Sequence, residues 1–122
     1  MKFKIINETK EIDLVSSAQV ASGFFLRLWG LMFRKKIGTN QALIFYQAPS
    51  IHTFFMRFPI DIIFLNKQMA VKRIVHSLPP WRAVFCPGAY VTIELPSAKI
   101  SQVKAQIGDK IKITPLTSTL IK

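Results

Sequence analysis

The sequence predicts a mainly β fold, marginally α+β, in the form of a jelly-roll-like β-sandwich or a partly open barrel with one or two short helices. Half of the 122 residues are hydrophobic, which is enough to form a core in a chain of this length. From residue 42 onward, most segments are short and rich in β-branched and aromatic residues, as strands are. No internal repeat or flexible linker divides the chain, so residues 1–122 are expected to form a single domain.

The N-terminal part is predicted to form a β-hairpin followed by a helix. KFKII (residues 2–6) and EIDLV (11–15) flank a polar turn at residues 7–10. Ser16-Ser17 can cap a helix, and apolar residues then recur at helical spacing: Val20, Phe24, Leu28 and Leu31. We therefore expect a short amphipathic helix within residues 17–32 that packs over a sheet.

The rest of the chain is predicted to consist mostly of strands. They are expected at ALIFY (42–46), IHTFFM (51–56), IDIIFL (60–65), MAVKRIVH (69–76), AVFC (83–86), AYVTIEL (89–95) and DKIKITPL (109–116). The two prolines of SLPPWR forbid regular pairing between two of these strands. A second helix is expected after Pro96-Ser97, because Ile100, Val103 and Ile107 recur at helical spacing and Gly108 can cap its C-terminus.

The charge balance favours contact with an anionic partner, although the scattered basic residues are more typical of a general basic surface. Seventeen Lys and Arg oppose six acids, which gives a net charge of +11. Such a surface favours an anionic ligand, a glycan or an acidic protein. Nucleic acid has less support, because the basic residues are scattered and Arg34-Lys35-Lys36 is the only tight cluster.

The compartment and the cofactor content follow from what the sequence lacks. Cys86 is the only cysteine, so neither an internal disulfide nor a multi-cysteine zinc site is expected. The N-terminus does not resemble a signal peptide, and the uncharged stretch 37–56 is too polar to span a bilayer. The sequence therefore predicts a cytoplasmic protein without a cofactor or metal, and leaves envelope association open.

Asp61 is the most informative acid. Strand alternation places it with Ile63 and Leu65 on one face, and Ile60, Ile62 and Phe64 on the other. A carboxylate in such apolar surroundings needs backbone N–H donors or an arginine. The candidate arginines are Arg27, Arg57, Arg73 and Arg82. We expect a structural carboxylate with Arg82 as its first candidate partner.

Two further stretches could carry a site. Trp81-Arg82 follows two prolines, and such a stiff loop suits stacking on a sugar or base or holding a carboxylate. A loop that Trp81 simply anchors to the barrel would have the same sequence, and this simpler reading is favoured. His52, Phe54 and Met56 would share one strand face, which hints at metal or haem ligation, but a hydrogen-bonded histidine explains the pattern more simply. Cys86 has no His or Asp at motif spacing, so an inert thiol is expected. No complete catalytic motif is present.

The order of the landmarks resembles a family known as domain-of-unknown-function family 192. The resemblance lies in Arg27 with GLMFR (30–34), ALIF (42–45), HTFFM (52–56) with PIDIIF (59–64), ELP (94–96) and IGD (107–109). It implies a single small β-rich domain of jelly-roll-like kind and no assigned activity. Carried over by position, its signature includes four charged residues: Arg27, Asp61, Glu94 and Asp109.

Three functions are open at this point. The leading hypothesis is a non-catalytic binding or accessory module, whose site for an anionic or carbohydrate-like ligand would use Arg57, Trp81, Arg82 and His52. The alternative is a small hydrolase or isomerase in which Asp61 or Glu94 is the base beside His52, which requires these side chains to meet in one cleft. A second alternative is an accessory factor of an envelope or secretion assembly.

Overall fold

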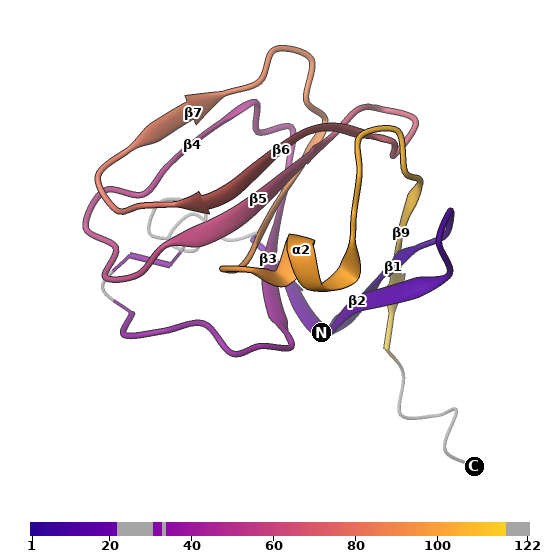
Figure 1. Cartoon of the computed structure of the whole chain (residues 1–122), viewed down its shortest axis with the longest axis horizontal. Coiled ribbons are helices and arrows are strands. Elements are labelled where there is room, and N and C mark those ends of the chain that lie inside the picture. Colours follow the sequence, from indigo (N-terminus) through magenta and orange to yellow (C-terminus); the bar gives the residue numbers. More distant parts are fainter. Residues whose placement is uncertain (22–30, 33, 117–122) are drawn as a thin grey trace.

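The computed structural model describes residues 1–21, 31–32 and 34–116, and strands dominate in these ranges. The strands are β1 (Phe3–Asn7), β2 (Ile12–Val20), β3 (Gln41–Tyr46), β4 (Ser50–His52), β5 (Ile60–Leu65), β6 (Val71–Leu78), β7 (Ala83–Phe85), β8 (Val91–Pro96) and β9 (Ile111–Pro115). A short helix, α2, spans Lys99–Val103. Seven strands form one sheet in the order β6-β5-β8-β3-β2-β1-β9, and β4 pairs with β7 separately (Figure 1). The predicted mainly β class is confirmed.

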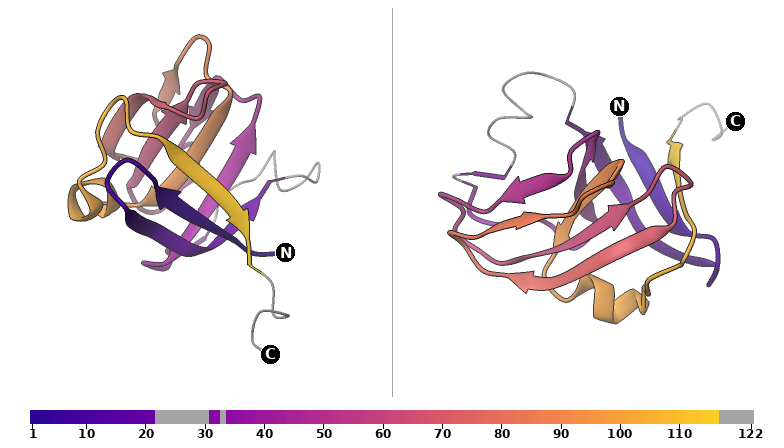
Figure 2. Two further views of the ribbon diagram at one scale, coloured as in Figure 1. Left: turned by 90° about the vertical axis from the view of Figure 1, so that its right-hand side faces the viewer. Right: turned by 90° about the horizontal axis from the view of Figure 1, so that it is seen from above.

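The seven-stranded sheet is strongly curled. Its neighbouring strands are antiparallel except for β2 and β3, which run parallel. The two end strands of the sheet meet at one corner, where Ala70 bridges Lys110 and the Ile111 N–H donates to the Met69 carbonyl at 2.9 Å. Figure 2 shows the resulting half-barrel. It corresponds to the partly open barrel among the predicted architectures.

The central strands are buried on both faces, and each face has its own apolar cluster. Ile63 and Leu65 of β5 belong to the cluster that also contains Ile100 and Val103 of α2. The intervening residues of β5 belong to the other cluster, together with residues of β4 and β3: Ile60, Ile62, Phe64, Ile51, Leu43 and Phe45. The predicted alternation of β5 is confirmed, and burial on both faces explains its nearly unbroken apolar sequence.

The predicted helix at 17–32 is wrong where the structure describes it. Residues 17–20 belong to β2, and residues 22–30 lie outside the described residues. The pair Ser16-Ser17, which suggested a helix cap, instead donates both backbone N–H groups to Asn40, at 2.8 Å to its side-chain oxygen and 3.1 Å to its carbonyl. Parallel pairing of β2 with β3 therefore overrides the capping signal.

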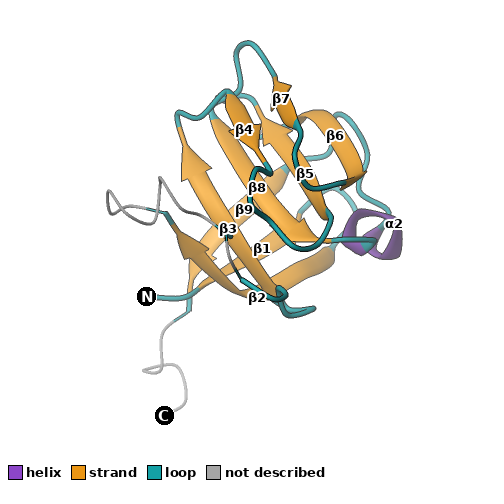
Figure 3. Cartoon of the chain, turned by 90° about the vertical axis from the view of Figure 1, so that its left-hand side faces the viewer, coloured by secondary structure: helices purple, strands orange, loops and turns teal. Residues whose placement is uncertain are grey.

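Two other predicted elements end several residues earlier in the structure. The strand expected at 51–56 ends at His52, because the chain turns at Thr53 and enters a left-handed conformation at Phe55. Helix α2 ends at Val103, and its C-cap is Lys104 rather than Gly108. Figure 3 shows this single short helix of the described residues beside the strands. No helix in the described ranges is long and apolar enough to cross a membrane.

Candidate functional site

Four aromatic side chains, from the end of β4 and from two loops, gather on the surface. We call His52, Phe54, Phe55 and Trp81 the aromatic ledge. The ring centroids of Phe54 and Trp81 are 5.9 Å apart in a stacked arrangement, and those of Phe55 and Trp81 are 4.7 Å apart edge-on. His52 lies 4.9 Å from Phe54. The exposed fractions of Phe54, Phe55 and Trp81 are 40%, 49% and 55%.

Thr53 joins the two loops of the ledge beneath its surface. Its backbone N–H donates to the Arg82 carbonyl at 2.8 Å, and its own carbonyl accepts the Trp81 N–H at 3.0 Å. Its hydroxyl donates to the Pro79 carbonyl at 2.7 Å and accepts the Arg82 N–H at 2.9 Å. Because Thr53 is fully buried, these bonds are shielded from water and hold the loops in one geometry.

Two residues of the ledge have a left-handed backbone. Phe55 has a φ of 63° and Trp81 a φ of 66°, a region that disfavours bulky side chains and costs on the order of 1–3 kcal/mol each. Such strain persists only where the surrounding structure fixes it, and it gathers at binding and catalytic sites. The hydrogen bonds of Thr53 supply that constraint on the backbone here.

Two arginines accompany the ledge in sequence. Arg82 follows Trp81 and is exposed, and its guanidinium makes one long hydrogen bond, 3.4 Å, to the Trp81 carbonyl. Arg57 lies two residues after Phe55 in the sequence and is also exposed. Both guanidinium groups can therefore meet an anionic group from solvent.

Asp61 is buried, but the predicted pairing with Arg82 is wrong. One carboxylate oxygen accepts the Ser77 N–H at 2.8 Å, and the other accepts the Ile100 N–H at 2.9 Å. The residue is 0% exposed. Asp61 thus fixes the end of β6 and the start of α2 with backbone donors, which the sequence analysis had named as the other way to satisfy a buried carboxylate.

Glu94 is buried in the middle of the sheet. In the sheet it lies opposite Leu43 on one side and Ile62 on the other, which places its side chain in an apolar cluster. Within the part of the chain that the structure describes, its Oε1 atom has no hydrogen-bond partner. Desolvation raises the pKa of Glu94 to about 8, and the charge of Arg34 partly opposes this rise.

The carboxylate of Asp109 is held by hydrogen bonds from three residues. Its Oδ2 atom accepts hydrogen bonds from the Asn7 amide at 2.8 Å, the Lys10 ammonium at 2.6 Å and the Gln106 N–H at 2.9 Å. Burial alone would raise the pKa of Asp109, but these hydrogen bonds and the Lys10 charge together lower it. The carboxylate therefore stays charged and joins the β1–β2 turn to the turn that precedes β9.

The predicted polar residues do not converge on one cleft. Asp61 pairs with Leu95 and Glu94 with Ile62 in neighbouring positions of β5 and β8, so the two carboxyl groups point to opposite faces of the sheet. The ring Nδ1 of His52 accepts the Phe54 N–H at 3.2 Å. Arg27 lies outside the described residues. Asp61 and Glu94 therefore cannot act together in one cleft, whereas the pairing of either acid with His52 stays a prediction.

Part of the ledge is predictable from the sequence. His52, Trp81 and Arg82 were candidates, whereas Thr53, Phe54 and Phe55 were assigned to an ordinary strand. Exposed aromatic residues cannot be told from core residues in a single sequence. A usable signal is the threonine that directly precedes Phe54-Phe55.

Comparison with known proteins places the chain in a family. A family model for DUF192, whose description is "Uncharacterized ACR", matches residues 5–113. The chain belongs to the DUF192 family. Among its relatives, a UPF0127 protein from Pyrococcus horikoshii is 37% identical over 117 residues, covering 88% of this chain and 96% of that protein. A UPF0127 protein from Thermococcus sibiricus is 36% identical over 115 residues, covering 88% and 72%.

A solved structure shares the DUF192 fold of this chain. The crystal structure of a protein of unknown function from Novosphingobium aromaticivorans matches with a TM-score of 0.77 at 20% identity, covering 90% of this chain and 82% of that one. At this level of identity the likeness shows the fold alone. The family resemblance predicted from the sequence is confirmed.

Proposed function

We propose that this DUF192 domain is a non-catalytic binding module that engages an acidic glycan on the aromatic ledge. The observation that carries the proposal is a rigid, solvent-exposed group of rings whose strained backbone is fixed by buried hydrogen bonds. Aromatic rings stack on the apolar faces of sugars, and a ring that is already held in place loses little entropy on binding.

The charge of the ligand follows from the surroundings of the ledge. Arg57 and Arg82 are exposed beside it in sequence, and the whole chain carries a net charge of +11. A guanidinium binds a carboxylate or sulfate through paired N–H groups. An acidic sugar therefore offers both contacts, its ring to Trp81 and its acid group to an arginine.

A glycan fits the arrangement better than a nucleic acid does. Single-stranded nucleic acid requires a basic groove that follows the backbone over several nucleotides, with rings spaced along it. The rings of the ledge form one compact group instead. The only tight basic cluster of the sequence, residues 34–36, lies in another segment.

The test measures binding of the full chain to a uronic-acid hexasaccharide by calorimetry, beside a neutral hexasaccharide and single-stranded oligothymidylate of matched length. We expect Trp81→Ala to weaken acidic glycan binding about tenfold or more, because aromatic anchors dominate such contacts. Arg82→Ala should weaken it too and lower its dependence on salt.

Phe85→Ala is the matched control, because Phe85 is 59% exposed on β7 and is not in ring contact with the ledge. This variant should bind as the natural chain does. Equal loss in Phe85→Ala, no binding to the acidic hexasaccharide at low salt, or stronger binding to oligothymidylate would overturn the proposal.

A further inference from the structure

A small pocket at the parallel strand pair is lined by hydrogen-bond donors. It has a volume of about 30 Å³, and its polar lining residues are Lys2, Ser17, Gln19, Arg34 and Gln41. They come from four places: the residue before β1, strand β2, strand β3 and the segment between β2 and β3. No residue of the aromatic ledge lines it.

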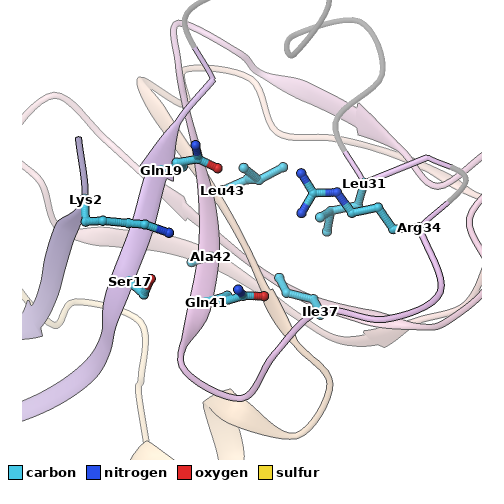
Figure 4. Close-up of a pocket in the computed structure, with 9 residues that line it drawn as sticks. All are labelled: Lys2, Ser17, Gln19, Leu31, Arg34, Ile37, Gln41, Ala42 and Leu43. Atoms are coloured by element: carbon cyan, nitrogen blue, oxygen red, sulfur yellow. The ribbon is translucent and has the colours of Figure 1, made fainter.

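The two cations approach the pocket from opposite sides. Figure 4 shows the Lys2 ammonium and the Arg34 guanidinium pointing toward each other, with the amides of Gln19 and Gln41 between them. The ion pairs among the described residues are Lys4–Asp13 and Lys10–Asp109. Neither cation of the pocket forms an ion pair with a carboxylate within the described ranges, although the charge of Arg34 acts on the buried carboxyl of Glu94.

The neutral side chains favour an anion as well. The Oε1 atom of Gln41 accepts the Gly38 N–H at 2.8 Å, so its NH₂ group remains available to donate. The Ser17 hydroxyl can also donate, while its backbone N–H is used by Asn40 at 3.1 Å. A lining of two cations, an amide NH₂ and a hydroxyl has the chemistry of an oxyanion site.

The size of the pocket limits the ligand to one group. One water requires roughly 10–15 Å³ of such volume, so a pocket of about 30 Å³ holds two oxygen atoms rather than a sugar ring or a nucleobase. Two oxygens are what a carboxylate, or one edge of a phosphoryl group, presents. We propose that this pocket binds the oxyanion end of a ligand at a site separate from the aromatic ledge.

The test is a titration of the full chain with inorganic phosphate, and separately with acetate, at constant ionic strength, followed by ¹H–¹⁵N NMR. We expect saturable shifts of the side-chain amides of Gln19 and Gln41. Arg34→Gln and Lys2→Ala should each weaken binding about tenfold, because each removes a charge-assisted contact. Tighter phosphate binding identifies a phosphoryl ligand, and tighter acetate binding a carboxylate; both outcomes support the site.

Lys35→Ala provides the matched control, because it removes the same charge beside Arg34 from an exposed residue that does not line the pocket. It should change the affinity by no more than about twofold. Shifts that rise linearly without saturating, or an equal loss in Lys35→Ala, overturn the site in favour of general screening by a basic surface. If Trp81→Ala loses phosphate binding, the pocket is not a site separate from the aromatic ledge.

Discussion

At the scale of single residues, Glu94 stands out because its carboxyl group is buried among apolar side chains. Its neighbours across the sheet are Leu43 and Ile62, and its Oε1 atom has no hydrogen-bond partner in the described part of the chain. Burial therefore raises the pKa of Glu94 to about 8, with Arg34 acting in the opposite direction. At neutral pH the folded protein holds this side chain mostly as a neutral acid.

This protonation predicts how stability depends on pH. The unfolded chain releases the Glu94 proton near its ordinary pKa of 4.5, while the folded chain retains it up to about 8. Between these values the unfolded state binds fewer protons, so the free energy of unfolding falls as the pH rises. A glutamine at position 94 cannot ionise. We therefore expect the free energy of unfolding of Glu94→Gln to fall less than that of the natural chain between pH 4.5 and 8.5, as measured by urea unfolding.

Glu8→Gln controls for the loss of an acid as such, since Glu8 is exposed. Its stability should follow the pH profile of the natural chain. Contributions from other groups are common to every variant, so only the difference between the profiles is informative. A Glu94→Gln profile that parallels the natural one would show that Glu94 is ionised in the folded protein at neutral pH.

At the scale of elements, sequence patterns predicted those strands whose burial matches their composition. The predicted and observed bounds of β5 coincide at 60–65, because both faces of this strand are packed and each residue is apolar or satisfied. The segment after β4 was predicted less well. HTFFM has the composition of a strand, yet Phe54 and Phe55 are exposed and the chain turns between them. The strand propensity of a residue indicates that it fits a pleated sheet, but not whether its side chain faces the core or the solvent.

The candidate site was only partly predictable for the same reason. Pro79-Pro80 marked a stiff loop in the sequence, so Trp81 and Arg82 could be found. The partner loop could not be found, because its link to them is a set of tertiary hydrogen bonds made by Thr53. The partners of Asp61 were missed likewise, since the sequence does not reveal which backbone N–H groups fold toward a carboxylate.

The hydrogen bonds of the Thr53 hydroxyl predict that this group links the two loops of the ledge. Thr53→Val keeps the shape of the side chain but leaves the Arg82 N–H and the Pro79 carbonyl without their hydroxyl partner. A buried polar group without a partner costs about 1–3 kcal/mol, so we expect the free energy of unfolding to fall by that amount in urea titrations. The NMR signals of the Trp81 backbone and indole N–H groups should broaden or shift.

Thr53→Ser retains the hydroxyl and serves as the control. It should stay close to the natural chain in the Trp81 signals, with a smaller loss of stability from the missing methyl group. If Thr53→Val is as stable as the natural chain and leaves Trp81 unchanged, then the hydroxyl does not hold the ledge, and the backbone bonds of Thr53 alone account for its geometry.

At the scale of the whole molecule, the fold depends on one corner where the curled sheet closes. There the Val71 N–H donates to the Asp109 carbonyl and the Gly108 N–H donates to the Val71 carbonyl, both at 2.9 Å. The same Asp109 uses its carboxylate to bind Asn7 at the end of β1 and Lys10 in the next turn. Asp109 thus joins β6, β9 and the β1–β2 hairpin, which lie far apart in the sequence (Figure 2).

Asp109→Asn tests whether this corner holds the half-barrel closed. The amide cannot pair with the Lys10 ammonium or accept as strongly from Asn7 and Gln106, so we expect the free energy of unfolding at pH 7 to fall by about 1–3 kcal/mol. The hydrogen bonds that lower the pKa of Asp109 below its ordinary 3.8 stabilise the fold above that pH and are lost as the carboxyl becomes protonated in acid. The variant should therefore lose less stability than the natural chain on acidification.

Asp13→Asn is the matched control, because Asp13 forms an exposed ion pair with Lys4 at 3.0 Å. Exposed pairs contribute roughly 0–1 kcal/mol, so this variant should unfold nearly as the natural chain does. Hydrogen exchange adds a readout specific to the corner: the amides of Val71 and Gly108 should lose protection in Asp109→Asn and keep it in Asp13→Asn. Equal effects of the two substitutions would mean that total charge, rather than the joint at Asp109, sets the stability of the curled sheet.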